Sequence, residues 1–269
     1  MKLAINIVDA FTDKQFKGNS AAVIVLDDWL SDTLMQSIAM ENNLSETAFL
    51  VAADTADNGV IAFNIRWFSP VTEIDFCGHA TLASAHVVFA KYTQHNSIEF
   101  RADAVGSMQV EKKHDGFIQM NFPNRAPTEP EYIPSALLDG LSITPQKVLQ
   151  NGQAYFAIYD NEDDVMIVEQ DASELRKLAP YDVVVTAPGQ HFDFVSRYFW
   201  PANGTDEDPV TGSIHTGLAP YWSQQLGKKA LEAYQASKRG GVLRCVVESD
   251  RVLISGQTVG YLTGEISIK

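Results

Sequence analysis

The sequence predicts an α+β protein made of two similar halves, each a curled β-sheet around one buried helix. Three observations support this. Short β-rich runs dominate the chain, two helical segments are apolar on nearly all sides, and similar phrases precede those two segments about half a chain length apart. A helix that is apolar on every side is buried on every side. Each such helix is therefore expected to form the core of its own half.

The first half reads as strands interrupted by two helices. Alternating or β-branched runs predict strands at 3–11, 22–26, 47–52, 60–68, 98–102, 107–112 and 117–122. Ser31 is a typical N-cap, and it opens a helix with Leu34, Met35, Ile38 and Ala39 on one face. The segment 78–91 (GHATLASAHVVFAK) is the first apolar helix, and its small residues allow close approach of the surrounding backbone.

The second half has a similar pattern of short predicted strands and one apolar helix. Strands are predicted at 154–159, 183–186, 193–199, 242–247, 252–254 and 261–268, and the second apolar helix spans 212–226. The stretch 123–134, which contains proline and glutamate, separates the halves and is the best candidate linker. The halves are accordingly placed at 1–122 and 123–258.

The entries to the two apolar helices resemble each other. Arg66-Trp67-Phe68-Ser69-Pro70 precedes the first, and Arg197-Tyr198-Phe199-Trp200-Pro201 precedes the second. Acidic residues follow each phrase, and a glycine, Gly78 or Gly212, then opens the helix. The repeated order indicates an internal duplication, with a cleft expected between the halves.

Composition excludes several classes of protein. The 269 residues are 45% hydrophobic and 20% charged, which is typical of a globular protein and not of a disordered or fibrous one. The formal net charge of −14 disfavours nucleic acid as a partner. Two cysteines, Cys77 and Cys245, make neither a disulfide framework nor a four-sulfur zinc site.

The sequence also gives expectations about location. Asp9 comes too early for the apolar core of a signal peptide, and no apolar run approaches the roughly 20 residues that span a bilayer. A cytoplasmic protein with reduced thiols and no membrane partner is expected.

The N-termini of the two apolar helices are the places where chemistry is expected. Unpaired backbone N–H groups and the positive end of the helix dipole favour an anion there, such as a substrate carboxylate. The residues at these ends are 77–81 (CGHAT) and 208–213 (DPVTGS). The alternative is ordinary capping, with Thr211 or Ser213 satisfying its own helix.

Three polar residues near these ends have competing interpretations. His79 is either functional or a hydrogen-bonded structural residue of an apolar helix. Asp208 belongs to an acidic run, which is usually a solvated face, although Pro209 suggests a fixed loop. Glu46 lies between a predicted helix and a predicted strand, and its spacing alone favours a solvent-facing loop residue.

Several motifs along the whole chain are shared with one family. They are VDAFT (8–12), FKGN (16–19), NLSETAF (43–49), RWFSP (66–70), CGHAT (77–81), EDPVTGS (207–213), QASKRGG (235–241) and DRV (250–252). With these motifs the chain resembles the phenazine-biosynthesis PhzF-like family, relatives of diaminopimelate epimerase and proline racemase. Two departures are Ser20, where the family often has proline, and Ile214, where alanine is common.

The resemblance implies a fold and an assembly. The fold is diaminopimelate epimerase-like, with two pseudo-symmetric β-barrel-like halves, each around a central helix. The last strand, within 259–269, is expected to return to the first half. The family also implies a homodimer and an active site between the halves.

The resemblance further implies an isomerase that moves a proton on a small carboxylic acid. Glu46 would be the base, and His79 and Asp208 would hold and shuttle protons. Substrate-binding residues would be Asn19, Gly78, Thr211, Gly212 and Ser213. No cofactor and no metal is expected, because these groups supply the acid and base, and His79 and His86 do not have metal-ligand spacing. The two-thiol racemisation of the relatives is not expected, because only Cys77 is retained. The roles of Cys77 and of Arg239, a possible anion contact, stay open.

Two other functions remain open at this point. A hydrolase using Ser213, His79 and Asp208 is one, although Ser213 lacks the Gly-x-Ser-x-Gly elbow. A non-catalytic carboxylate-binding protein on the same scaffold is the other, because fold alone does not determine function.

Overall fold

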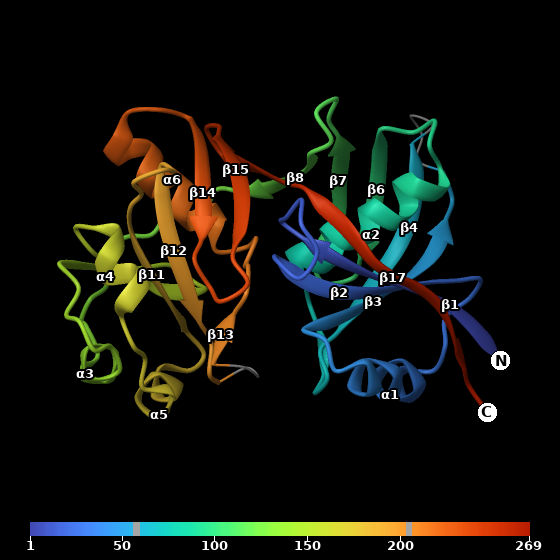
Figure 1. Cartoon of the computed structure of the whole chain (residues 1–269), viewed down its shortest axis with the longest axis horizontal. Coiled ribbons are helices and arrows are strands. Elements are labelled where there is room, and N and C mark those ends of the chain that lie inside the picture. The colour runs from blue at the N-terminus through green and yellow to red at the C-terminus, as the bar shows by residue number, and fades with distance from the viewer. Residues whose placement is uncertain (56–59, 203–205) are drawn as a thin grey trace. The chain divides into compact units, whose positions relative to one another are not determined.

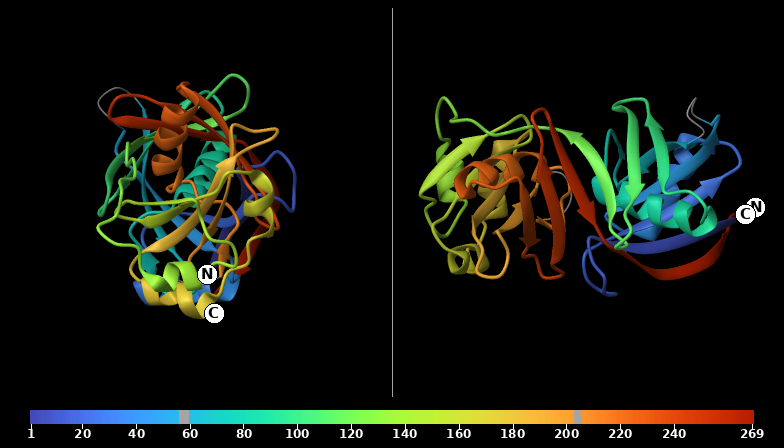
Figure 2. Two further views of the ribbon diagram at one scale, coloured as in Figure 1. Left: turned by 90° about the vertical axis from the view of Figure 1, so that its left-hand side faces the viewer. Right: turned by 90° about the horizontal axis from the view of Figure 1, so that it is seen from above.

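The computed structural model describes residues 1–55, 60–202 and 206–269, and the chain divides into two compact units (Figure 1). Unit 1 comprises Met1–Asn121 and Ser255–Lys269, and unit 2 comprises Phe122–Ile254. Both termini lie in unit 1 and are close together in both views of Figure 2. The described helices include none that is long and apolar enough to cross a membrane.

Unit 1 is a mixed sheet with two helices. Its elements are β1 (Lys2–Ala10), β2 (Asn19–Leu26), α1 (Asp32–Asn42), β3 (Glu46–Ala53), β4 (Ile61–Phe68), β5 (Glu73–Ile74), α2 (Gly78–Lys91), β6 (Ser97–Ala102), β7 (Gly106–Lys112), β8 (Ile118–Pro123, at the boundary) and β17 (Thr258–Ser267). The last strand, β17, pairs antiparallel with β1 along nearly its whole length. The sheet of unit 1 is therefore completed by the C-terminal end of the chain.

Unit 2 contains the remaining elements. They are α3 (Ser135–Asp139), β9 (Lys147–Gln150), β10 (Ala154–Ile158), α4 (Glu162–Ile167), α5 (Ala172–Leu175), a 3₁₀ turn (Arg176–Leu178), β11 (Asp182–Pro188), β12 (Phe194–Phe199), β13 (Glu207–Asp208), α6 (His215–Leu226), β14 (Ala230–Gln235), β15 (Gly241–Val247) and β16 (Arg251–Gly256). The expected linker, 123–134, belongs to this unit, and there Thr128 exchanges two backbone hydrogen bonds of 2.8 Å with Gln150.

The two units repeat one order of strand pairing. In unit 1, β2 is parallel to β3, β3 is antiparallel to β4, and β4 pairs antiparallel with β5 and parallel with β6. In unit 2, β10, β11, β12, β13 and β14 are paired in the same way. The registers also match, since Ala21 faces Glu46 and Ala154 faces Asp182 at the start of the parallel pairs. By this register, Asp182 is the counterpart of Glu46.

The repeated Arg-aromatic-Phe phrase makes the same ion pair in each unit. Arg66 on β4 donates from Nε and Nη2 to Glu73 on β5, both at 2.6 Å, and Arg197 on β12 does so to Glu207 on β13 at 2.9 and 3.0 Å. Hydrogen bonding to Glu73 raises the pKa of Arg66 further above its already high value. A bidentate pair of this kind fixes a short hairpin strand in direction. The hairpins leading to the two apolar helices are thus held alike.

Helix α2 is the core of unit 1, as its composition predicts. It packs against β1, β2 and β3, and most of its side chains are buried. Two hydroxyl groups on it bond within the helix, from Thr81 to the Cys77 carbonyl at 2.6 Å and from Ser84 to the Ala80 carbonyl at 2.7 Å. These bonds satisfy the polar groups of two buried side chains.

Helix α6 begins later than its sequence predicts, at His215 and not at Gly212. The preceding residues form a tight turn, in which His215 N–H donates to the Gly212 carbonyl at 3.2 Å and Thr216 N–H donates to the Ser213 carbonyl at 3.1 Å. Such i→i+3 bonds are common in the first turn of a helix. The sequence also gave no prediction of β9 and β14, whose residues carry too little alternation to stand out.

We predict that His215 makes the protein less stable in mild acid. His215 is fully buried, its Nδ1–H donates to the Thr211 carbonyl at 2.8 Å, and burial lowers its pKa from 6.5 to about 4. The unfolded chain therefore binds a proton on this ring between pH 6.5 and 4 that the folded chain does not. As pH falls through this window, up to about 3 kcal/mol of unfolding free energy is lost.

The measurement is urea unfolding at several pH values, with His215→Asn as the control because its amide also donates to a carbonyl. The variant should lose less stability between pH 6.5 and 4 than the parent protein. Equal slopes for the two proteins would show that His215 is not responsible.

Candidate active site

Three chemically reactive side chains meet in unit 1 where β3 and α2 begin. Glu46 is the first residue of β3, His79 is the second residue of α2, and Cys77 is the N-cap of that helix. Glu46 Oε2 lies 3.0 Å from His79 Nε2, and Cys77 Sγ lies 3.4 Å from His79 Nδ1. All three residues are buried, and Glu46 is only 2% exposed. The expectation of a solvent-facing Glu46 is therefore wrong, because the parallel pairing of β3 with β2 draws the residue into the sheet.

The Glu46 carboxylate carries an oxygen with unused hydrogen-bonding capacity. Although His79 is close, no aligned hydrogen bond reaches Glu46 Oε2 within the described part of the chain. Most buried carboxylates are fully bonded, and an exception calls for a reason. Catalytic contacts are often bent before the substrate binds. A proton acceptor poised for a ligand fits this geometry.

Asn19 and Ser45 complete the surroundings of His79. The amide nitrogen of Asn19 lies 3.2 Å from His79 Nδ1, and the Ser45 hydroxyl donates to the amide oxygen of Asn19 at 3.1 Å. Asn19 is fully buried at the start of β2. Three elements, the starts of β2, β3 and α2, therefore supply one connected polar cluster.

The loop before Asn19 is held in an unusual backbone conformation. Phe11, Phe16 and Gly18 all have positive φ, at 63°, 69° and 64°. The carboxylate of Asp9 anchors this loop, because it accepts from the Phe16 N–H at 2.9 Å and from the Ser20 hydroxyl. Strain of this kind persists only where the surroundings enforce it, and it is frequent at functional sites.

The donor set of Glu46, Cys77 and His79 also has the composition of a metal site, with its ligand atoms within 4.8 Å of one another. The hydrogen bonds argue against that use. Both ring nitrogens of His79 already face protein groups, Nδ1 the Asn19 amide nitrogen at 3.2 Å and Nε2 the Glu46 carboxylate at 3.0 Å. In a neutral imidazole one of the two nitrogens carries the proton and has no lone pair for a metal ion. The cluster suits proton chemistry better.

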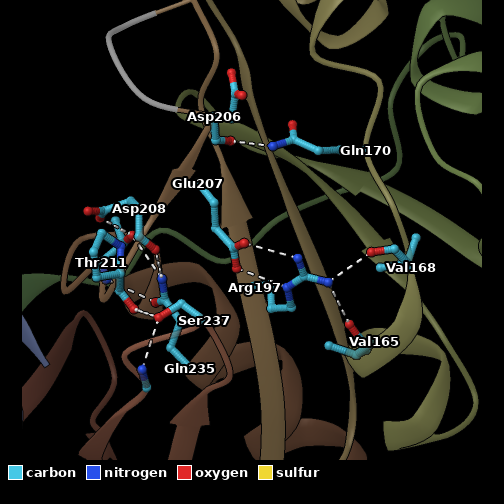
Figure 3. Close-up of polar contacts among 12 residues, drawn as sticks. Val165, Val168, Gln170, Arg197, Asp206, Glu207, Asp208, Thr211, Gln235 and Ser237 are labelled. Atoms are coloured by element: carbon cyan, nitrogen blue, oxygen red, sulfur yellow. Dashed lines mark hydrogen bonds and ion pairs between the residues drawn. The ribbon is translucent and has the colours of Figure 1, made fainter. Parts of the chain in front are cut away.

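A second polar cluster lies in unit 2 around Asp208 (Figure 3). The Thr211 hydroxyl donates to the Asp208 carboxylate, and Gln235 binds both residues, accepting from Thr211 N–H at 2.9 Å and donating to the Asp208 carbonyl at 2.9 Å. Asp208 is 6% exposed, so it belongs to a fixed loop and not to a solvated charged face. The Ser237 hydroxyl donates to the Pro209 carbonyl at 2.7 Å and ties the 237–240 turn to the same loop.

Ser213 lies in the turn before α6 and is bound by Gln153. The two amide hydrogens of Gln153 go to Ser213 Oγ at 2.9 Å and to the Tyr198 hydroxyl at 3.0 Å, and Tyr198 donates to Asp182 at 2.6 Å. Burial, followed by the charge of Asp182, raises the pKa of Tyr198 well above its ordinary value. The phenol therefore stays protonated. Because Ser213 accepts from Gln153, its own proton points elsewhere and is available to a ligand.

The duplication explains why Glu46 and Asp182 differ. The register places Trp67 where unit 2 has Tyr198, since each faces the third residue of its neighbouring strand. Tyr198 has a hydroxyl that binds Asp182, whereas Trp67 has none. Where unit 2 has Tyr198, unit 1 has Trp67, which offers no hydroxyl to Glu46. One oxygen of the Glu46 carboxylate therefore keeps an unused acceptor site within the described residues.

The other expected site residues are placed as follows. Gly78 is buried as the first residue of α2, and Gly212 is buried in the turn before α6. Arg239 is half-buried next to Gly240. Gly240 has a φ of +69°, and a Cβ at this position would collide with the Tyr234 side chain. Cys245 is buried in β15, and burial raises its pKa to about 12, so it is not a reactive thiol.

Sequence reasoning missed the residues that orient the site residues. They are Ser45, Gln153, Asp182 and Gln235. Isolated amides such as Gln153 and Gln235 belong to no recognisable pattern of chemistry. An overlay of the two halves on their Arg-aromatic-Phe phrases does not find Asp182 either, because their offset of 131 residues places Glu46 opposite Lys177.

The arrangement of strands and helices defines an α+β protein of the epimerase-like structural class. A hydroxyproline epimerase from Agrobacterium vitis, solved with bound trans-4-hydroxy-L-proline, has a TM-score of 0.60 at 9% identity and covers 98% of this chain and 92% of its own. A likeness at this identity concerns the fold alone. The expected diaminopimelate epimerase-like architecture is confirmed.

Within that class, the chain belongs to the phenazine biosynthesis-like family, whose model matches residues 8–264. A PhzF-family protein from Enterococcus faecalis has a TM-score of 0.92 at 40% identity, with full coverage of both chains. A Pseudomonas aeruginosa protein named as an uncharacterized isomerase is 44% identical over 268 residues, again with full coverage of both. The family expected from the motifs is confirmed.

We predict that Gly18→Ala will damage unit 1 more than an equivalent change elsewhere. A Cβ at Gly18 would lie 2.1 Å from the Ala10 carbonyl oxygen, besides the strain of a φ of +64°. Gly106, with a φ of +74° and nothing within 4 Å, is the matched control. Gly106→Ala should cost roughly 1 kcal/mol of unfolding free energy, from conformational strain alone. Gly18→Ala should cost more, as measured by urea unfolding, and similar losses would show that the loop yields freely.

Proposed function

We propose that this protein is an isomerase that moves a carbon-bound proton on a small carboxylic acid, with Glu46 as the base. The observation that carries the proposal is the buried Glu46 carboxylate, 2% exposed, with an oxygen that no aligned hydrogen bond reaches among the described residues. An acceptor that the protein leaves unused is available to a substrate proton. Relatives named as uncharacterized isomerases support isomerase activity in general.

Removal of a proton from carbon by a carboxylate is demanding. General base catalysis contributes roughly 10²–10⁴-fold, and donors aimed at developing negative charge contribute about 10²–10³-fold for each well-placed bond. Glu46 supplies the base. His79, whose Nε2 lies 3.0 Å from it, supplies an adjacent polar hydrogen. Proton removal by Glu46 with the help of His79 uses only side chains of the protein and no cofactor.

The residues of unit 2 have proposed roles in the same reaction. Asp208, held by Thr211 and Gln235, is a second proton-carrying group. Ser213 is a donor to the substrate carboxylate, because its oxygen accepts from the Gln153 amide and its own proton stays available. The N–H groups near Gly78 and Gly212 would bind the same acid group. Asn19 and Thr211 stay proposed binding residues, and the homodimer and the site between the halves stay predictions.

The main competing function is a carboxylate-binding protein without turnover, and one experiment separates the two. Small cyclic and amino carboxylic acids are incubated with the protein in heavy water, and deuterium incorporation is followed by mass spectrometry. An isomerase of this kind exchanges a carbon-bound hydrogen with solvent for its substrate. Binding without exchange across the panel would favour the competing function.

We predict that Glu46→Gln abolishes this exchange while the protein stays folded. The amide keeps the shape of the side chain and removes the base, so the rate should fall by about 10²–10⁴-fold. Glu41→Gln, at an exposed position of α1, is the matched control and should exchange at the parent rate. If Glu46→Gln retained the parent rate, the assignment of the base would be wrong.

We predict that Gln153→Glu weakens substrate binding through Ser213. A carboxylate at this position accepts from Ser213 and takes the proton that the substrate would use. The loss of one hydrogen bond to a charged group raises KM about tenfold or more. Gln190→Glu, an exposed change of the same charge, is the control. An unchanged KM in Gln153→Glu, with its thermal stability retained, would remove Ser213 from the binding site.

A further inference from the structure

We propose that Asn19 and Ser45 are positioning residues that hold the neutral ring of His79 in one tautomer, with its proton on Nε2 facing Glu46. The catalytic meaning of this arrangement rests on the proposed function, but the arrangement itself is a property of unit 1 alone. All the residues involved lie in that unit, at the starts of β2, β3 and α2.

The two ends of the Asn19 amide differ in their hydrogen bonding. Its oxygen only accepts hydrogen bonds and its nitrogen only donates them. The Ser45 hydroxyl donates to the oxygen at 3.1 Å, and the nitrogen then faces His79 Nδ1 at 3.2 Å. A neutral imidazole that accepts at Nδ1 carries its proton on Nε2. The serine thus acts on the ring through the amide.

The reversed amide gives a poorer set of contacts. Its oxygen would face Nδ1, which would have to carry the proton, and the bare Nε2 would then face an ionised Glu46 across 3.0 Å. Two lone pairs at that distance repel each other. In the observed orientation the amide nitrogen of Asn19 faces an acceptor at Nδ1, and the Nε2 proton lies on the side of the Glu46 carboxylate. Cys77 agrees with it, because a thiol at 3.4 Å from Nδ1 is also a weak donor to that atom.

The proposed tautomer gives His79 and Glu46 different chemical roles. With its proton on Nε2, neutral His79 presents a polar N–H on the side of Glu46 and cannot accept a proton there. Between these two residues, Glu46 is then the proton acceptor. The depth of the cluster matters, because Asn19 is fully buried and His79 is 5% exposed, which leaves little water to compete for these bonds.

The test is a long-range ¹H–¹⁵N correlation spectrum of protein labelled in its histidine rings. The chain has 6 histidines, and His79→Gln identifies the signals of His79. Near neutral pH, the expected pattern is a protonated Nε2 and an unprotonated Nδ1. A proton on Nδ1 in the parent protein, with or without one on Nε2, would overturn the proposal.

Three variants separate positioning from simple structural support. Asn19→Asp presents only acceptors, so a proton should appear on Nδ1. Ser45→Ala releases the amide and should shift the tautomer ratio about fivefold toward the Nδ1 form, the effect of one neutral hydrogen bond. Ser45→Thr keeps the hydroxyl and should restore the parent pattern. A Ser45→Ala protein that changes thermal stability but not the tautomer would overturn the proposal.

The outcome is independent of the proposed function. The spectrum needs no substrate, so the tautomer can be as proposed even if Glu46→Gln retains full exchange activity, in which case only the function fails. Conversely, an unshifted ratio in both Asn19→Asp and Ser45→Ala, together with an inactive Glu46→Gln, removes the positioning role and leaves the base in place.

Discussion

The contact between the buried carboxylate of Glu46 and the ring of His79 is the constraint on which the organisation of unit 1 depends. Burial of a charged group is unfavourable unless polar partners surround it. Here the partners come from the starts of three different elements, which must therefore meet at one point. Asp9 anchors the loop before Asn19, whose positive φ angles lead the chain into the start of β2.

The duplicated architecture shows how one scaffold supports two chemical environments. Both units fix the entry to their central helix with an Arg–Glu pair, yet the polar groups at the helix starts differ. Asp182 is bound by Tyr198 and linked through Gln153 to Ser213, so its network is closed. Glu46 has no such hydroxyl partner from the neighbouring strand. Divergence at a few positions, with the strand order retained, was sufficient to give Asp182 a hydroxyl partner from the neighbouring strand and Glu46 none.

Much of the fold was predictable because its signals are local. The apolar character of α2 and the N-cap Ser31 depend on neighbouring residues, and the repeated Arg-aromatic-Phe phrases needed only a comparison of the chain with itself. The predicted start of α6 was too early in the sequence. Gly212 and Ser213 fit a helix start but instead form a tight turn, in which Ser213 accepts a hydrogen bond from Gln153. The burial of Glu46 was not predictable from spacing, since it follows from a parallel pairing between β2 and β3. Identification of the site depended on family motifs, whereas the amides that orient it needed coordinates.

The pairing of β17 with β1 has a consequence for biosynthesis. The chain emerges from the ribosome N-terminus first, at about 5–20 residues per second, so every strand of unit 2 emerges before β17 does. During that interval one edge of β1 lacks its partner and exposes a row of unpaired backbone groups, which is a template for wrong association. Unit 2 can thus mature first, while unit 1 waits until β17 has been translated.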